Sequence, residues 1–152
     1  MKYVYLYVNL CEFIKQCVSG YRYAYPNQKF ELEAANKEIT KEINPDLFYQ
    51  MLDKLIANAV DFSYPSKPIL VKLINNPNKI IIQVINYGPY LSEGMTNELF
   101  NSMISIRDKH VDEGPHLGLG LFIAKLIVEF HEGLITAENL RETEGVCFSI
   151  II

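Results

Sequence analysis

Apolar side chains recur along the chain at two different spacings, which predict a mixture of helices and strands. Residues 10–24 place them three and four positions apart, as an amphipathic helix does, and Gly20 suggests an end close by. Residues 28–34 (QKFELEA) alternate apolar and polar side chains, which is typical of a half-buried strand. Residues 37–43 fit a second, shorter strand, and the apolar opening at residues 1–10 fits either a strand or the lead-in to the first helix.

The remainder of the chain continues this alternation of elements. Asn44 and Pro45 predict a helix start, because Asn caps well and Pro suits the first turn; this helix should run to about Ser63. Two strands follow over 69–74 and 79–85, joined by the turn sequence NNPN. We then expect a loop over 86–95, a short helix over 96–104, a mobile polar loop over 105–117, a helix over 118–131, and final strands over 133–139 and 146–152. The pattern predicts an α/β domain with a mixed, mostly antiparallel sheet covered by helices.

Composition narrows the class of protein. A chain of 152 residues, 49% hydrophobic and 21% charged, suits one globular domain with a substantial core. The net charge of −4 gives no electrostatic reason to expect a nucleic acid as partner. No apolar run reaches the roughly 18 residues of a membrane span. The three cysteines lack metal-site spacing and fit reduced residues in a cytosolic domain.

A glycine-rich segment at residues 114–133 (GPHLGLGLFIAKLIVEFHEG) leads directly into the predicted helix. Free backbone N–H groups and the positive end of the helix dipole make such a turn an anion site, and glycine allows a phosphate to approach closely. A dinucleotide fingerprint fails because Ile123 stands where a third small residue is needed, and the Gly-Lys-Ser/Thr of a Walker loop is absent. Alternatively, Gly114, Gly118 and Gly120 only shape a loop and a close helix packing.

Three further segments accompany the glycines. Asn58 lies within an otherwise apolar helix, where Asn is disfavoured and a buried amide without partners costs about 1–3 kcal/mol. Either it is a satisfied core residue or it presents its oxygen to a magnesium ion. The segments at 85–91 (INYGPYL) and 98–103 (ELFNSM) follow. In this order and spacing, the four segments resemble the ATP-binding domain of sensor histidine kinases, in the gyrase, chaperone, histidine kinase and MutL ATPase superfamily.

The resemblance covers about residues 47–152, and residues 10–33 resemble the helix and strand that usually precede such a domain. It implies a two-layer α/β sandwich (the Bergerat fold) with helices on one face of the sheet and an ATP lid over 105–117. It also implies that Asn58 binds Mg²⁺, that Gly118 and Gly120 surround the phosphates, and that Gly114 is a hinge. The residues expected to contact ATP are Asn58, Asn86, Gly88, Tyr90, Gly114, Leu117, Gly118, Leu119, Gly120 and Leu121.

Other positions match the family pattern in a supporting role. Leu99 and Phe100 match a Phe-containing box that packs beneath the lid. His131 matches the usual end of the last helix and is expected to be structural. The charged lid residues, which either reach phosphate or are simply solvated, are Arg107, Lys109 and His110.

Several residues depart from the family pattern. The usual Asp-x-Gly-x-Gly box reads Asn-Tyr-Gly-Pro-Tyr here; Asn86 offers adenine a neutral acceptor, which bonds more weakly than a carboxylate. Tyr90 replaces a glycine and either stacks on adenine or fills the pocket. Asp61 stands where these kinases often carry a basic phosphate ligand. Lys54 replaces the water-activating Glu of hydrolysing relatives, and Asp53 lies about 100° around the helix from it, so it is no direct substitute.

The resemblance implies that the whole protein transfers the γ-phosphoryl group of ATP, with Mg²⁺, to a histidine on a dimerisation domain and then to a response regulator. The chain has no phosphoacceptor-histidine hairpin, so we expect it to be one part of a larger, homodimeric kinase. This part is expected to be cytoplasmic, and the parent anchored in the inner membrane. The pattern NxGP…LF.SM.S.R…GPHLGLGL also resembles a proteobacterial subgroup, the histidine kinases of dedicated sortase systems.

Two other functions share this fold. Asn86, Tyr90 and Asp61 are compatible with a degenerate domain that acts by binding partners. A serine kinase that inhibits a sigma factor is the other alternative, and the missing water-activating Glu does not separate it from a histidine kinase.

Overall fold

The computed structural model describes residues 4–34, 37–91 and 116–152, with the backbone alone for 116–118. Its elements, in chain order, are β1 (Leu6–Asn9), α1 (Leu10–Ala24), β2 (Phe30–Ala34), β3 (Thr40–Ile43), α2 (Pro45–Phe62), β4 (Ile69–Asn76), β5 (Lys79–Asn86), α4 (His116–Phe130), β6 (Leu134–Asn139) and β7 (Val146–Ile151). The helix predicted over 96–104 and all but the end of the predicted lid lie outside the described residues.

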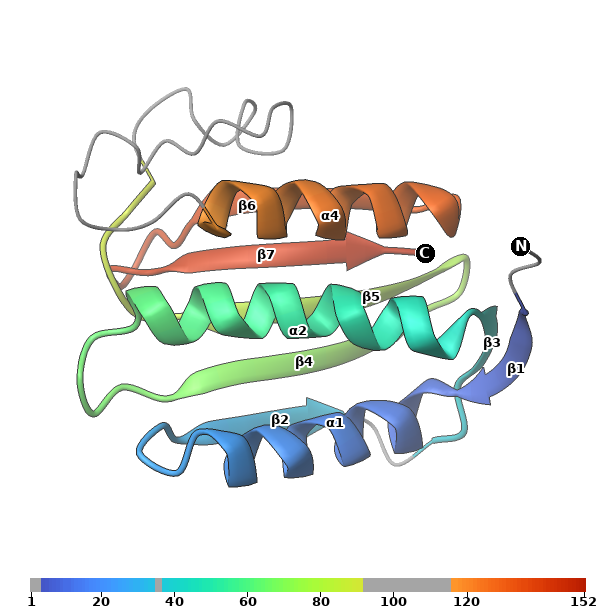
Figure 1. The fold of residues 1–152 in the computed structure, drawn as a ribbon, viewed down its shortest axis with the longest axis horizontal. Helices are drawn as coiled ribbons and strands as arrows, with labels where there is room; N and C mark the ends of the chain where they lie inside the picture. The colour runs from blue at the N-terminus through green and yellow to red at the C-terminus, as the bar shows by residue number, and fades with distance from the viewer. Residues whose placement is uncertain (1–3, 35–36, 92–115) are drawn as a thin grey trace.

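A five-stranded sheet forms one layer of the domain, in the order β2-β4-β5-β7-β6. Only the β2–β4 pair is parallel, and the other three pairs are antiparallel. The helices α1, α2 and α4 lie side by side over one face of this sheet, with α2 in the middle (Figure 1). The predicted two-layer α/β sandwich with a mixed, mostly antiparallel sheet is therefore confirmed. A separate antiparallel pair, β1 and β3, lies beside it.

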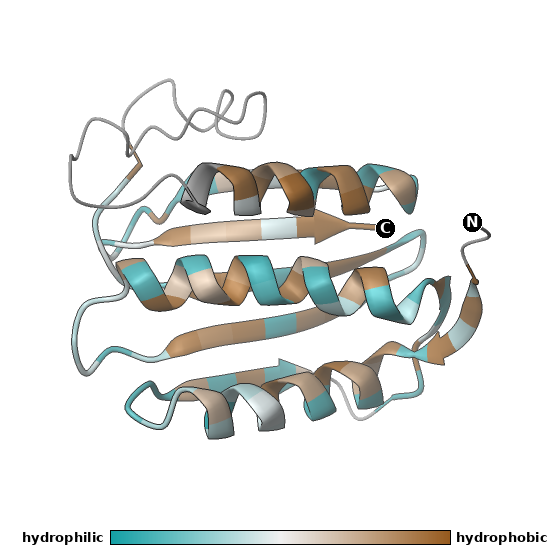
Figure 2. Cartoon of the chain, viewed as in Figure 1, coloured by the Kyte–Doolittle hydropathy of each residue, from teal (hydrophilic) through white to brown (hydrophobic). Residues whose placement is uncertain are grey.

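Local sequence signals explain where the first two helices begin. The side-chain oxygen of Asn9 accepts from the backbone N–H of Cys11 at 3.1 Å and caps α1. Asn44 caps α2 through the N–H of Leu47 at 3.0 Å, and Pro45 occupies the first turn as predicted. Helices and strands then bury their apolar faces against each other, around fully enclosed side chains such as Phe48 and Phe148. Hydrophobic residues dominate the central strands, whereas polar residues mark the outer helix faces (Figure 2).

One helix boundary differs from prediction. α1 spans the predicted range 10–24; Gly20 does not end it and lies within it on an exposed face, with open space around an added Cβ. α4 begins at His116, two residues before the predicted start, so residues 116–117 belong to the helix and not to the lid. The apolar opening was compatible with a strand or with the lead-in to the first helix, and it forms a strand, β1. Within the described residues, no helix is long and apolar enough to cross a membrane.

Candidate nucleotide-binding site

The interior of α2 carries a buried amide whose nitrogen lacks a hydrogen-bond partner among the described residues. Asn58 is only 3% exposed, and its Nδ2 atom has no hydrogen-bond partner among the described residues. An unsatisfied buried donor costs about 1–3 kcal/mol, so its presence in the core needs a reason other than stability. A ligand that accepts from this amide or binds its oxygen would supply that reason.

A second unpartnered amide lies at the end of β5. Asn86 is 2% exposed and pairs through its strand with Ile69 of β4 and Val146 of β7, while its Nδ2 atom has no partner in the described part of the chain. Gly88 follows it, and a Cβ there would overlap the carbonyl oxygen of Phe62 and lie 3.2 Å from the Asn86 Nδ2 atom. Phe62 is one turn beyond Asn58 on α2. The close approach at Gly88 therefore brings the end of β5 against the part of α2 that carries Asn58.

Neighbouring segments hold the loop after β5 in place. The N–H of Tyr64, just after α2, donates to the carbonyl of Tyr87 at 2.8 Å. On the other side, the Asn139 side chain accepts from the N–H of Leu91 at 2.8 Å and donates to its carbonyl at 2.9 Å. A Cβ at Gly145 would lie 2.5 Å from the Asn86 carbonyl oxygen, so the β6–β7 turn also packs closely against this loop.

Tyr90 belongs to the same loop and is anchored away from its own segment. Its hydroxyl donates toward the carbonyls of Leu140 at 2.7 Å and Thr143 at 3.0 Å, both in the β6–β7 turn, and the residue is 46% exposed. This tether is neither of the two roles expected for Tyr90, stacking on adenine or filling the pocket, and nothing in the sequence signals it. Asn139 was not expected either, and its only signal is an amide at the end of a predicted strand.

The glycine-rich helix packs against α2. A Cβ at Gly120 would lie 3.6 Å from Cδ and 3.9 Å from Cβ of Lys54, so the lysine stem lies against this glycine. Leu121 is 3% exposed and belongs to the core, whereas Leu119 is 39% exposed. Leu117 and Gly118 fall in the first turn of α4. The other predicted site and lid residues, which lie outside the described residues, are Gly114, Leu99, Phe100, Arg107, Lys109 and His110.

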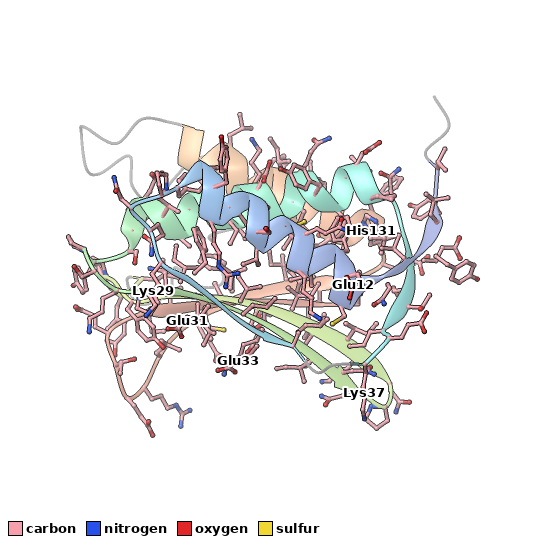
Figure 3. The ribbon with its side chains drawn as sticks, turned by 90° about the horizontal axis from the view of Figure 1, so that it is seen from below. Glu12, Lys29, Glu31, Glu33, Lys37 and His131 are labelled. Carbon is pink, nitrogen blue, oxygen red and sulfur yellow. The ribbon has the colours of Figure 1, made fainter. Side chains whose placement is uncertain are left out.

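His131 joins the end of α4 to the start of α2, at the end of the molecule where Figure 3 labels it. Its Nε2 atom accepts from the backbone N–H of Asn44 at 3.0 Å, so Nδ1 carries the proton and donates to the carbonyl of Ile127 at 2.7 Å. Both ring nitrogens are used within the fold, which agrees with the structural role predicted for this histidine.

Two acidic residues of α2, Asp53 and Asp61, influence titratable groups of α1 and of the residue that follows it. Burial, and then the nearby Asp53 carboxylate, raise the pKa of the Cys17 thiol to about 11. The same two causes raise the pKa of the buried Tyr21 hydroxyl. Burial, Asp53 and then Asp61 raise the pKa of Tyr25, which follows the end of α1. The Asp53 carboxylate therefore places negative charge on the side of α2 that faces α1.

Comparison with known proteins agrees with this architecture. Residues 43–152 match the family model described as histidine kinase-, DNA gyrase B-, and HSP90-like ATPase, and the chain belongs to this family. Within it, sequence and fold are those of the ATP-binding domain of a two-component sensor kinase.

Individual relatives support this more specific assignment. The sensor protein VanSC of Enterococcus gallinarum is 32% identical over 107 residues, covering 70% of this chain and 29% of that protein. The bacteriophytochrome of Pseudomonas aeruginosa is 26% identical over 142 residues, covering 93% of this chain and 19% of that protein. A nucleotide-free structure of the catalytic domain of the histidine kinase ThkA is 26% identical, with a TM-score of 0.82, covering 98% of this chain and 97% of that one. The chain thus spans less than a third of these two sensor proteins.

Proposed function

We propose that the chain binds ATP between α2, the loop after β5 and the first turns of α4. The two enclosed amides of Asn58 and Asn86 carry this proposal, since each has an Nδ2 atom without a partner in the described part of the chain, and both lie near the same end of α2. An amide offers one acceptor and two donors, which suits Asn86 for the edge of an adenine ring. The glycine-rich start of α4 supplies backbone donors for the phosphates. The contacts expected of Gly88, Tyr90, Leu117, Gly118, Leu119, Gly120 and Leu121, and of Gly114 beyond the described residues, are part of this proposal.

The same site fits a magnesium ion, provided that ATP itself supplies most of the ligands. Mg²⁺ prefers oxygen donors and is commonly held by one or two protein groups plus substrate phosphates. Asn58 offers an amide oxygen, and no group of three or more His, Cys, Asp or Glu side chains suited to a metal occurs among the described residues. When bound, the ion would neutralise phosphate charge, and Asn58 would position it.

We further propose that the whole protein transfers the γ-phosphoryl group to a histidine of a dimerisation domain and then to a response regulator. Lys54, not an acidic residue, stands four positions before Asn58, so the helix provides no general base there to activate water. The ThkA histidine kinase has been solved in complex with the response regulator TrrA, and the matching chain is 26% identical. The proposed parent is a homodimer anchored in the inner membrane, with this domain in the cytoplasm.

Calorimetric titration with Mg-ATP tests the binding site. The wild-type chain should bind, and Asn58→Ala should lose most of the affinity because it removes the amide. Asn76→Ala is the matched control, since Asn76 is exposed and lies at the opposite end of β4 from the Asn86 pairing. Absence of binding by the wild type would favour the partner-binding alternative.

The chemistry of the transferred phosphoryl group separates the two kinase alternatives. With a dimerisation domain supplied in trans and radiolabelled ATP, a histidine kinase gives an acid-labile, alkali-stable product. Acid-stable phosphoserine on a protein partner would instead indicate the anti-sigma type of kinase.

We also propose that the parent belongs to the sortase-system subgroup of histidine kinases. The order Asn86, Gly88, Pro89 and the segment Gly114–Leu121 support this subgroup. Phosphotransfer from the parent kinase to a panel of response regulators tests it, with preference for a sortase-linked regulator as the expected result.

A further inference from the structure

One lysine of α2 lies against the glycine-rich helix. Lys54 is exposed, one turn before Asn58, and its methylene stem lies 3.6 Å from the position that a Gly120 Cβ would occupy. The aliphatic part of this side chain therefore packs against α4 near the start of that helix.

The charge of Lys54 is not neutralised within the described part of the chain. The ion pairs found there engage Lys15, Lys29, Lys72 and Lys125, and none involves Lys54. For example, the Lys29 ammonium lies 3.8 Å from the Glu31 carboxylate at the start of the edge strand β2 (Figure 3). The adjacent acid, Asp53, lies close enough to Cys17 and Tyr21 of α1 to raise the pKa of both groups.

An enclosed polar group lies one turn beyond Lys54 on α2. Asn58, on the same side of α2, is 3% exposed and leaves Nδ2 without a partner among the described residues. Within the described residues, an ammonium without an ion-pair partner and a buried Nδ2 atom without a hydrogen-bond partner thus lie one turn apart on α2, next to the first turns of α4. All three favour an anion that accepts hydrogen bonds.

We propose that Lys54 is a phosphate ligand of the bound nucleotide. It would supply positive charge from α2, where the position usually occupied by a basic phosphate ligand holds Asp61 instead. This inference rests on the proposed ATP site and assigns it a specific cation. Asp61 lies two turns further along α2 and is exposed, and its carboxylate would repel phosphate. The charge on the nucleotide-facing side of α2 therefore comes from before Asn58 and not after it.

Binding of ATP and adenosine to charge variants tests the inference. Lys54→Met keeps the stem and removes the charge, Lys54→Arg keeps the charge, and Lys79→Met is the control, because Lys79 is exposed at the opposite end of the sheet. The Kd for Mg-ATP should rise about tenfold or more in Lys54→Met, because a hydrogen bond to a charged group is lost. It should rise less in Lys54→Arg, which keeps the positive charge. The Kd for adenosine, measured by NMR at millimolar concentration, should not change. Raising the salt concentration should narrow the ATP difference.

The outcomes separate this inference from the proposed function. Wild-type binding of ATP with an unchanged Kd in Lys54→Met would overturn the role of Lys54 and leave the ATP site standing. Equal losses of ATP and adenosine affinity would also overturn it, because a phosphate ligand does not act on adenosine. Absence of ATP binding by the wild type would overturn both. Thermal unfolding of each variant verifies that it is folded.

Discussion

No side chain fits at Gly88, because the backbone of a neighbouring segment lies too close. An added Cβ would overlap the Phe62 carbonyl oxygen, and backbone atoms cannot move aside as a flexible side chain can. We expect Gly88→Ala to lower the free energy of unfolding by about 3 kcal/mol, the upper part of the usual range for overpacking. Urea denaturation measures the change, and a matching loss of Mg-ATP affinity is expected because the loop carries Asn86.

Gly20 provides the matched control for this substitution. It lies in the interior of α1 with nothing within 4 Å of an added Cβ. Gly20→Ala should therefore raise the free energy of unfolding by about 0.5–1 kcal/mol, because alanine loses less backbone entropy in a helix. If both glycine substitutions destabilised the protein equally, the close approach at Gly88 would not be the cause.

Cys17 makes stability sensitive to alkali. Burial, and then the Asp53 carboxylate, raise the pKa of its thiol from 9.0 to about 11, so the native state holds this proton more tightly than the unfolded chain. Between pH 9 and about 11 the unfolded state binds fewer protons, and stability falls as pH rises. Below pH 9 this contribution is fully present. Cys17→Ala should flatten this part of the profile measured by urea denaturation from pH 7 to 11; an unchanged slope would contradict the assignment.

At the scale of elements, His131 connects α4 to the cap of α2. His131→Phe keeps a ring near Phe48, whose centroid lies 5.6 Å away, but leaves the Asn44 N–H without its acceptor. We expect a loss of about 1–3 kcal/mol, the usual cost of an unsatisfied buried donor. Thermal unfolding measures the loss, and faster hydrogen exchange at the Asn44 amide locates it. Unchanged exchange at this amide would show that the contact does not protect it.

The elements with strong local signals could be predicted from sequence. Asn44 and Pro45 define the start of α2 through capping and ring geometry, which depend on neighbouring residues alone. The NNPN turn between β4 and β5 is equally local, although the strands run slightly further than predicted. The first helix also has the predicted range, and Gly20 is tolerated within it because helix propensity is a weak preference that tertiary packing overrides. The β1–β3 pair depends on contacts distant in sequence and was not expected.

The candidate site divides in the same way. Asn58 can be identified from sequence because an amide in an apolar helix is locally anomalous, and the structure buries it with no partner for Nδ2 among the described residues. The tether of Tyr90 to Leu140 and Thr143 spans about 50 residues of chain and leaves no periodic signal. From sequence alone, Lys54 stands out only because it replaces the water-activating Glu of hydrolysing relatives. Its contact with Gly120 depends on how α2 and α4 pack, which the sequence does not reveal.

At the scale of the whole molecule, the proposed ligand would contact segments that the fold brings to one end. The end of α2, the loop after β5 and the β6–β7 turn meet there through Gly88, Tyr90 and Gly145. The same segments border the main hydrophobic core, which joins all three helices to the sheet. Because one core connects these segments, ligand binding to the native state should stabilise the domain as a unit.

Mg-ATP should therefore raise the unfolding temperature in a single transition. A ligand at about 100 times its Kd adds roughly 2.7 kcal/mol to the native state. For a domain of this size that corresponds to about 5–10 °C, measured by calorimetry or circular dichroism. Asn58→Ala should show little shift at the same concentration, while Asn76→Ala should respond like the wild type. A second transition that ATP leaves unmoved would mean that the site is energetically separate from the core, and a shift preserved in Asn58→Ala would place the ligand elsewhere.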